Sequence, residues 1–276
     1  VASAGPRRML RGGTALRAGV LVDMAVLPAH RSLGPALMLQ AALVQAASPR
    51  FDLLYGFPNP KAAPVFKRAG YAPLANIHRY ARVLRHGGYL SRRLPAFLAL
   101  PVGLLLDALD RLRLSRRAAG LACEWASRAG EACDALWRAS DPDPGPVAIR
   151  DREFLEWRFD DSPLCEVRYL LVGREDGAAM GWFACEARGG NLHVVDFWTR
   201  GGSAGPDEAQ LARLLLAARD AGHASVSVEL GGAATGSAWG AAGFVARESR
   251  AVFGRATGTA AGPGDIIWLT SADEDE

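Results

Sequence analysis

The chain has 276 residues, of which 50% are hydrophobic and 22% are charged, as in an ordinary folded protein. Its net charge of +3 is too small to give the basic footprint of a nucleic-acid-binding protein, so we expect no nucleic-acid partner. A chain of this length can bury one large hydrophobic core or two modest ones.

The cysteines and histidines indicate neither a disulfide framework nor a metal site. Cys123, Cys133, Cys165 and Cys185 are irregularly spaced and form no C-x-x-C pair, which is typical of free thiols in a reducing compartment. The histidines show no metal-ligand spacing. We therefore predict a cytoplasmic protein without a bound metal.

Strands and helices alternate in the N-terminal part, after a weakly patterned stretch at 1–12. In chain order the pattern predicts one or two strands at 14–27, a helix at 35–47, a strand at 51–57, a short helix at 61–71 and a strand at 76–86. Pro35 fits the first turn of its helix, where a missing N–H costs nothing, and Gly70 ends the short helix.

The middle of the chain, from about 90 to 139, has a helical pattern with arginines on its polar faces. Its apolar run "LPAFLALPVGLLL" at 94–106 is too short to span a bilayer and carries two prolines, so we predict no transmembrane segment. We expect a core-facing helix there, and a membrane-surface or partner-binding helix remains the alternative. The stretch "DPDPGP" at 141–146 is the clearest linker.

The C-terminal part again alternates strands and helices. The pattern predicts a helix at 152–159, strands at 166–174, 180–187 and 191–198, a helix at 207–222, a strand at 224–230, a short helix ending at 241–244, a strand at 247–254, and a last strand followed by a solvated acidic tail within 266–276. Acceptor recognition by Trp157 and Arg158 is an alternative to simple packing of the first of these helices.

The order of elements repeats along the chain. Tyr71 follows Asp23 by 48 residues, and Phe244 follows Asp196 by the same 48. Asp23 closes a strand and Asp196 lies in one, and in both segments a Gly-Pro turn then opens a long helix and a glycine before the aromatic residue ends a short helix. We interpret this as an internal duplication.

The first repeat carries a pattern that suits an anion. Arg31, Gly34 and Ala36 form R-x-x-G-x-A directly after a strand and at a helix N-terminus. Unpaired backbone N–H groups and the positive end of the helix dipole favour a pyrophosphate there. Gly34 lets the backbone approach the ligand closely, and the small Ala36 leaves the path clear.

These residues resemble a known family. "VDMAVLPAHRSLGPAL" resembles the acyl-CoA-binding motif of the GNAT superfamily of N-acyltransferases, and "YGFPNPKAAPVFKRAGY" is similar to its next strand and helix. Together they cover about residues 14–85. The resemblance implies an α/β fold with a mixed sheet and two GNAT-like domains in tandem, joined by a helical segment. We expect a partial acyl-CoA-binding domain at 1–88, a connector at 89–146 and a degenerate second domain at 147–276.

The resemblance also implies roles for individual residues. The backbone of Met24, Ala25 and Val26 would pair with the pantetheine of the acyl-CoA. The expected pyrophosphate cradle consists of Arg31, Ser32, Leu33, Gly34 and Ala36, and Asn59 would lie along the cofactor arm. Asp23 is the candidate base, and Tyr55 is a candidate acid, with Tyr71 as its neighbour.

Three departures from the family pattern bear on catalysis. Pro35 removes one amide from the cradle, and Phe66 stands where the family often has an acidic tyrosine, which phenylalanine cannot replace as a proton donor. The N-terminal part is also short, with 22 residues before Asp23, so we expect it to lack its opening strand and helices.

The leading hypothesis is an N-acyltransferase that moves an acyl group, acetyl above all, from acyl-CoA to the amine of an unidentified acceptor. A non-catalytic binding module of the same fold is the alternative, motivated by Phe66 and Pro35. A third hypothesis is an aminoacyl-tRNA-dependent transferase of tandem GNAT-like fold, against which the low net charge argues.

Overall fold

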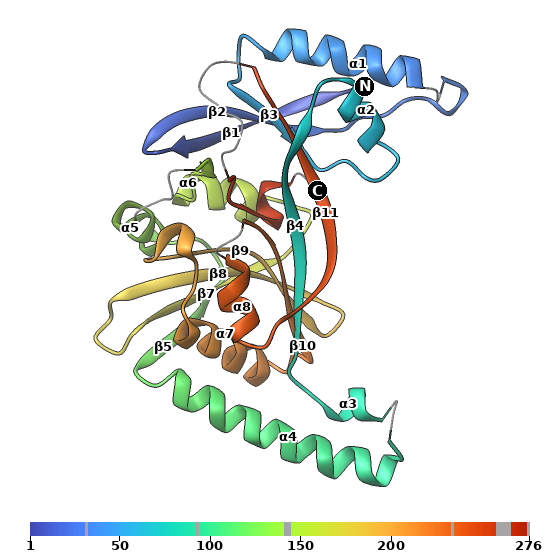
Figure 1. The fold of residues 1–276 in the computed structure, drawn as a ribbon. Coiled ribbons are helices and arrows are strands. Elements are labelled where there is room, and N and C mark those ends of the chain that lie inside the picture. The colour runs from blue at the N-terminus through green and yellow to red at the C-terminus, as the bar shows by residue number, and fades with distance from the viewer. Residues whose placement is uncertain (31–32, 92–93, 141–144, 233–234, 258–265, 275–276) are drawn as a thin grey trace.

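The computed structural model describes residues 1–30, 33–91, 94–140, 145–232, 235–257 and 266–274. Within these residues the strands form one mixed sheet of 12 strands, so the class is α/β (Figure 1). The strands are β1 (Ser3–Arg11), β2 (Thr14–Val22), β3 (Leu53–Gly56), β4 (Ala72–Val83), β5 (Leu121–Ala126), β6 (Val147–Ala148), β7 (Val167–Arg174), β8 (Ala179–Arg188), β9 (Asn191–Thr199), β10 (Ser225–Gly231), β11 (Val245–Ala256) and β12 (Leu269–Thr270).

The helices come between these strands. They are α1 (Leu33–Ala47), α2 (Ala63–Arg68), α3 (Gly87–Leu90), α4 (Ala96–Arg117), α5 (Glu131–Ala139), α6 (Arg152–Leu155), α7 (Glu208–Asp220) and α8 (Thr235–Ala241), with short helical turns η1 (Pro28–His30), η2 (Glu156–Asp160), η3 (Gly202–Ala204) and η4 (Ser271–Asp273). None of the described helices is long and apolar enough to cross a membrane.

The two long strands β4 and β11 join the N-terminal and C-terminal parts of the sheet. The strand order is β5-β7-β8-β9-β10-β4-β11-β3-β2-β1-β6, with β12 paired to β10 outside this path. β4 belongs to the N-terminal part but pairs with β10, and β11 belongs to the C-terminal part but pairs with β3. Figure 1 shows β4 and β11 running side by side along the molecule. The two parts have therefore exchanged strands, and the expected units 1–88 and 147–276 share one sheet.

The hydrophobic core follows the same exchange. One cluster of buried side chains combines Val20 of β2 and Tyr55 of β3 with Val252 of β11 and Leu269 of β12. Because these residues exclude water only together, the strands of the N-terminal part depend on the C-terminal part for their core.

Two strands differ from the sequence expectation. The weakly patterned stretch at 1–12 contains β1, which pairs with β2 along its full length through a turn at Gly12 and Gly13. Both glycines have positive φ, +54° and +77°, as a tight hairpin requires. The region expected to be helical up to 139 contains β5, which pairs with β7 at the edge of the sheet.

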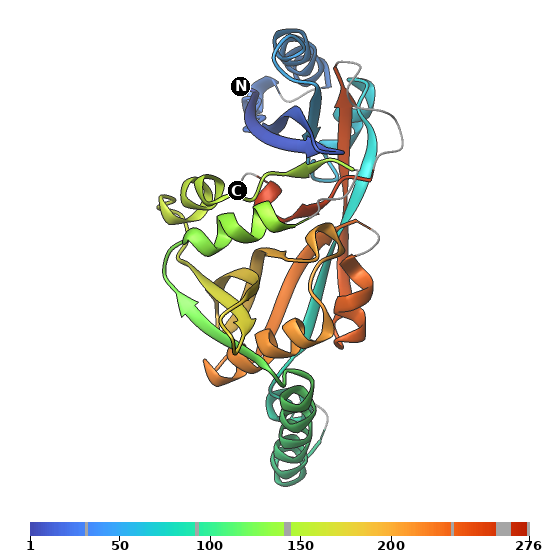
Figure 2. The same ribbon diagram turned by 90° about the vertical axis from the view of Figure 1, so that its left-hand side faces the viewer.

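The expectation of a core-facing helix at 94–106 was wrong. This run forms the N-terminal half of α4, and most of its large apolar side chains are exposed, for example Phe97 by 75% and Leu104 by 61%. The helix lies at one end of the molecule and projects beyond the body (Figure 2). Its packed face is formed by Ala99, Gly103 and, further along the helix, Leu114, so the apolar run is mostly turned outward.

Candidate functional site

The first part of the candidate site is the parallel strand pair of the N-terminal half. β2 and β3 are paired only from Ala18 to Val20 and from Leu53 to Tyr55. Both strands continue past this point, β2 against β1 and β3 against β11. We call the end of the pairing, at Val20 and Tyr55, the first divergence. No strand in the described part of the chain pairs with β3 on this edge beyond the first divergence.

Gly56 lies directly after the first divergence, where the two strands are still close. A side-chain carbon at this position would come within 3.0 Å of Leu21 and 3.1 Å of Phe66. Phe66, which stands where a proton donor was sought, is buried against Tyr71 at 5.1 Å between ring centroids. The absence of a side chain at Gly56 therefore leaves room for Leu21 of β2 and Phe66 of α2 to pack against the divergence.

The chain beyond β2 holds the candidate base and the residues expected to pair with pantetheine. Asp23 is exposed and has a φ of +53°, a left-handed conformation that aspartate tolerates better than most residues. The Ala25 N–H donates to the Val1 carbonyl, and the Ala25 carbonyl accepts from the Val1 nitrogen. The backbone of Ala25 is thus already paired. Met24 and Val26, on either side of it, are half-buried.

The expected pyrophosphate cradle lies at the start of α1. Arg31 and Ser32 lie outside the described residues, and Leu33 is the first residue of the helix. Gly34 is exposed, and a side-chain carbon built on it would meet nothing within 4 Å. Ala36 is buried beneath it. Among the described residues, the space beside Gly34 in the first helical turn is therefore open, as an anion cradle requires.

Asn59 and the two tyrosines have other surroundings. Asn59 is exposed, and its side-chain oxygen accepts from the N–H groups of Lys61 and Ala62, both at 3.0 Å, so it caps the turn before α2. Tyr55 is fully buried and donates its hydroxyl to the Asp273 carbonyl at 3.1 Å. Burial raises the pKa of Tyr71 to about 12, with Arg255 opposing, so its phenol stays protonated near neutral pH.

The corresponding strand pair of the C-terminal half, β9 and β10, also diverges, but a third strand occupies the space between its strands. β9 and β10 are paired only from Leu192 to Val194 and from Val226 to Val228, which defines the second divergence. β12 then pairs with β10 on the edge that β9 has left, Thr270 opposite Leu230. The second divergence is therefore filled by the protein's own C-terminal segment.

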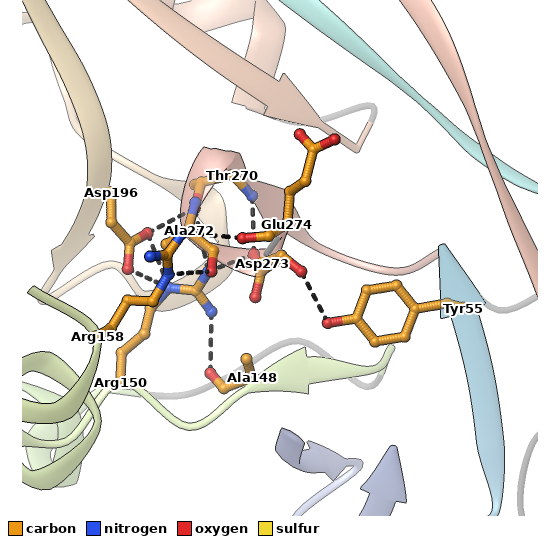
Figure 3. Close-up of polar contacts among 9 residues, drawn as sticks. All are labelled: Tyr55, Ala148, Arg150, Arg158, Asp196, Thr270, Ala272, Asp273 and Glu274. Atoms are coloured by element: carbon orange, nitrogen blue, oxygen red, sulfur yellow. Dashed lines mark hydrogen bonds and ion pairs between the residues drawn. The ribbon is translucent and has the colours of Figure 1, made fainter. Parts of the chain in front are cut away.

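A buried ion cluster fixes this segment (Figure 3). Arg150 is completely buried and donates from Nε to Asp196 at 3.0 Å and from Nη2 to Asp273 at 2.6 Å. Thr270 completes the cluster, since its hydroxyl donates to Asp196 at 2.8 Å and its N–H donates to Asp273 at 2.8 Å. Burial raises the pKa of Asp196 to about 6, while Arg150 opposes this. The counterpart of Asp23 thus serves structure, and the acidic tail is not solvated at Asp273.

Beside this segment lies a polar cavity of about 350 Å³ that the sequence analysis did not find. It is lined by arginines, glutamates and one histidine, among them Arg158, Arg250, Glu229 and Glu274. Arg250 pairs with Glu229 at 2.7 Å and also with Glu274, and its guanidinium lies 5.5 Å from the ring of Phe57 just after β3. The cavity therefore lies within the C-terminal part, and the Arg250 side chain connects its wall to Phe57 of the N-terminal part.

His193 forms another wall of the cavity. Its Nδ1 lies 2.9 Å from the Ser227 hydroxyl and its Nε2 lies 3.4 Å from the Ser271 hydroxyl. Burial lowers the pKa of His193 to about 4, and the nearby Arg188 acts in the same direction. This histidine is therefore neutral near neutral pH and links β9, β10 and the C-terminal segment.

Replacing Arg150 by methionine should destabilise the protein by about 3–5 kcal/mol, because two buried carboxylates lose their counter-charge. Urea denaturation followed by circular dichroism measures the free energy of unfolding. The variant R150M/D196N/D273N removes the unpaired charges and should lose less than R150M alone. Equal stability of R150M and the unmodified protein would contradict the structural role of the cluster.

His193→Gln should change how stability depends on pH. The folded pKa of about 4 lies below the ordinary value of 6.5, so between these values the unfolded chain binds a proton that the folded chain does not. The free energy of unfolding of the unmodified protein should therefore fall by up to roughly 3 kcal/mol relative to H193Q as the pH is lowered from 6.5 to 4. Asp196, common to both proteins, cancels in this difference. Parallel pH profiles would refute the assignment.

Comparison with known proteins places the fold. No protein-family model matches the chain, and no curated protein matches it. It is similar to a conserved protein of unknown function from Enterococcus faecalis V583, described as a probable N-acyltransferase, with a TM-score of 0.63 and 12% identity over 93% of this chain and 58% of that chain. It is also similar to a GCN5-related N-acetyltransferase from Anabaena variabilis, with a TM-score of 0.61 and 12% identity over 93% of this chain and 59% of that chain.

The yeast N-myristoyltransferase from Saccharomyces cerevisiae, solved with bound myristoyl-CoA, gives a TM-score of 0.53 and 14% identity over 92% of this chain and 65% of that chain. The chain thus spans less than two thirds of the length of these three solved proteins. The protein has a GNAT-like fold, the fold of GCN5-related N-acetyltransferases.

Proposed function

We propose that the protein is an acyl-CoA-dependent N-acyltransferase whose donor binds at the first divergence. The contrast between the two divergences carries this proposal. β12 and the Arg150 cluster fill the second, whereas the first leads to a helix start where the space beside Gly34 is open among the described residues. A splayed parallel pair next to a helix N-terminus suits a ligand with an extended polar arm and a pyrophosphate.

The donor residues proposed from the sequence fit this arrangement to different degrees. Leu33, Gly34 and Ala36 each offer a backbone N–H in the first turn of α1, while Pro35 offers none. Met24 and Val26 follow the first divergence, so they are the proposed partners of the extended arm. Asn59 is occupied in capping and contributes through the position of its turn.

The proposed reaction is the attack of an acceptor amine on the thioester carbonyl. A C–N bond forms, the C–S bond breaks, and the proton that the amine loses balances the proton that the leaving thiolate takes up. Asp23 is exposed at the strand end and is the proposed proton acceptor. Tyr55 is buried with its hydroxyl donated to Asp273, so we assign it to holding the C-terminal segment.

The polar cavity beside the C-terminal segment, whose wall includes Arg250, is the proposed acceptor pocket. Its glutamates Glu229 and Glu274 would attract an amine in its cationic form, and Arg158 and Arg250 would orient polar groups of the acceptor. A non-catalytic binding module of the same fold is the second candidate. Phe66 favours it, since this side chain cannot donate a proton to the leaving group.

Gly34→Ala should weaken acetyl-CoA binding about tenfold, because the added methyl group enters the space where the backbone would approach the ligand. Titration calorimetry with acetyl-CoA measures the affinity of the unmodified protein and of the variant. The fold should tolerate the change, with the free energy of unfolding unchanged or raised by up to about 1 kcal/mol.

The matched control is Gly240→Ala in α8, another exposed helical glycine whose added carbon would meet nothing within 4 Å. It should bind acetyl-CoA like the unmodified protein. A dissociation constant of about 1 mM corresponds to a binding free energy of about 4 kcal/mol. If the unmodified protein does not bind acetyl-CoA at about millimolar concentration, acetyl-CoA is ruled out as the donor.

Asp23→Asn should lower kcat about a hundredfold with little change in acetyl-CoA affinity, because it removes the base and keeps the shape. Asparagine also tolerates the left-handed backbone of this position. The measurement is release of the CoA thiol with a panel of amino acids, polyamines and lysine-containing peptides. Asp161→Asn, at another exposed aspartate, is the control. Binding of acetyl-CoA without thiol release for any amine would instead support the non-catalytic module.

A further inference from the structure

The outward face of α4 is a feature of the molecule that the proposed activity does not use. Large apolar side chains line it and are exposed by 39% to 75%. The six that define the α4 outer face are Phe97, Leu100, Leu104, Leu105, Leu106 and Leu112. Exposed apolar surface of this extent marks an interaction site in a folded protein.

The helix is attached to the body by small and polar residues and by Leu114, which is buried in the core. Gly103 approaches the backbone of Gly87 so closely that a side-chain carbon would come within 2.7 Å of it. Asp107 accepts from His86 Nδ1 at 2.7 Å, and Asp110 accepts from Arg82 at 2.6 Å. Except at Leu114, the usual arrangement of an amphipathic helix, with apolar residues inward and polar residues outward, is therefore reversed.

The apolar arc is wide. At about 100° per residue, the positions from Leu100 through Phe97 and Leu105 to Leu106 span roughly two thirds of the helix circumference. A helix that pairs with a second copy of itself buries a narrow stripe of residues spaced three and four apart. An arc of this width would leave most of its apolar side chains in water against such a partner. The fluid acyl chains of a lipid layer, in contrast, can surround the whole arc.

The acidic residues of α4 lie on its inner face, and two arginines lie on its outer face. Both of its aspartates, Asp107 and Asp110, face the body and are paired there. Arg113 and Arg116 are exposed on the same arc as the apolar residues, and neither has an ion-pair partner in the described part of the chain. The outer face is therefore apolar along most of its length and positive towards its C-terminal end.

From this arrangement we infer that α4 seats the protein on the surface of an anionic lipid bilayer. The apolar side chains enter the boundary between headgroups and acyl chains, and Arg113 and Arg116 lie at the level of the anionic headgroups. The end of the molecule that carries α4 projects beyond the body, so the helix can reach a flat surface (Figures 1 and 2).

The test is co-sedimentation of the 276-residue protein with vesicles of phosphatidylcholine containing about 30% phosphatidylglycerol, compared with pure phosphatidylcholine. The protein should bind the anionic vesicles more tightly. Leu104→Glu/Leu105→Glu should lose at least about tenfold in binding, and Arg113→Gln/Arg116→Gln about thirtyfold. These side chains are exposed, so both variants should keep the thermal unfolding transition of the unmodified protein.

The control for added charge is Leu164→Glu/Ile266→Glu, at two apolar residues exposed by 78% and 62% outside α4. It should bind anionic vesicles like the unmodified protein. Absence of vesicle binding, binding that L104E/L105E leaves intact, or an equal loss in the control would each overturn the inference. A dimer in sedimentation velocity that L104E/L105E dissociates, without vesicle binding, would identify a second copy as the partner and would also overturn it.

Discussion

The buried ion cluster around Arg150 is the constraint on which the rest of the structure depends. Arg150 is removed from water completely and is compensated by Asp196 of β9 and Asp273 of η4. A buried charge is tolerated only when its partners are in place, because the desolvation penalty is several kcal/mol per ion. The cluster therefore permits one position for the C-terminal segment relative to the sheet.

That position has consequences on both sides of the molecule. On one side, β12 is held against β10 and fills the second divergence. On the other side, the Asp273 carbonyl receives the hydroxyl of Tyr55 from β3, and Arg158 donates to the carbonyls of Ala272 and Glu274 (Figure 3). A single segment thus connects the filled divergence to the strand that carries the first one, and it also forms part of the wall of the polar cavity.

The sequence was sufficient where structure is local. The helix expected at 35–47 corresponds to α1, the strand at 51–57 to β3, and the position of Gly70 to a left-handed residue with a φ of +84°. Periodicity and turn residues are enough for such elements. The glycine pair at 12–13 and the alternation of "LACEWA" indicate β1 and β5. The weak pattern of residues 1–12 and the helical pattern of residues 90–139 argued against these strands.

The sequence was insufficient where partners come from distant segments. The exchange of β4 and β11 and the meeting of Arg150 with Asp196 and Asp273 depend on pairings that no local pattern records. The apolar run of α4 shows the same limit, since hydrophobicity predicts burial but does not say against what. Of the candidate site, Gly34 and Asp23 lie in accessible positions, Tyr55 lies in the core, and Arg31 and Ser32 lie outside the described residues.

The strand exchange places the two splayed strand pairs in different surroundings. β3 is held by β11 on one edge, and its buried face packs on Val252 and Leu269. Strands of the C-terminal part therefore hold the strands of the first divergence in place, without a further strand inserted between them in the described part of the chain. The second divergence lies beside the Arg150 cluster and is closed by β12. Asp196, beyond the second divergence, is buried in this closure, whereas Asp23, beyond the first divergence, is accessible.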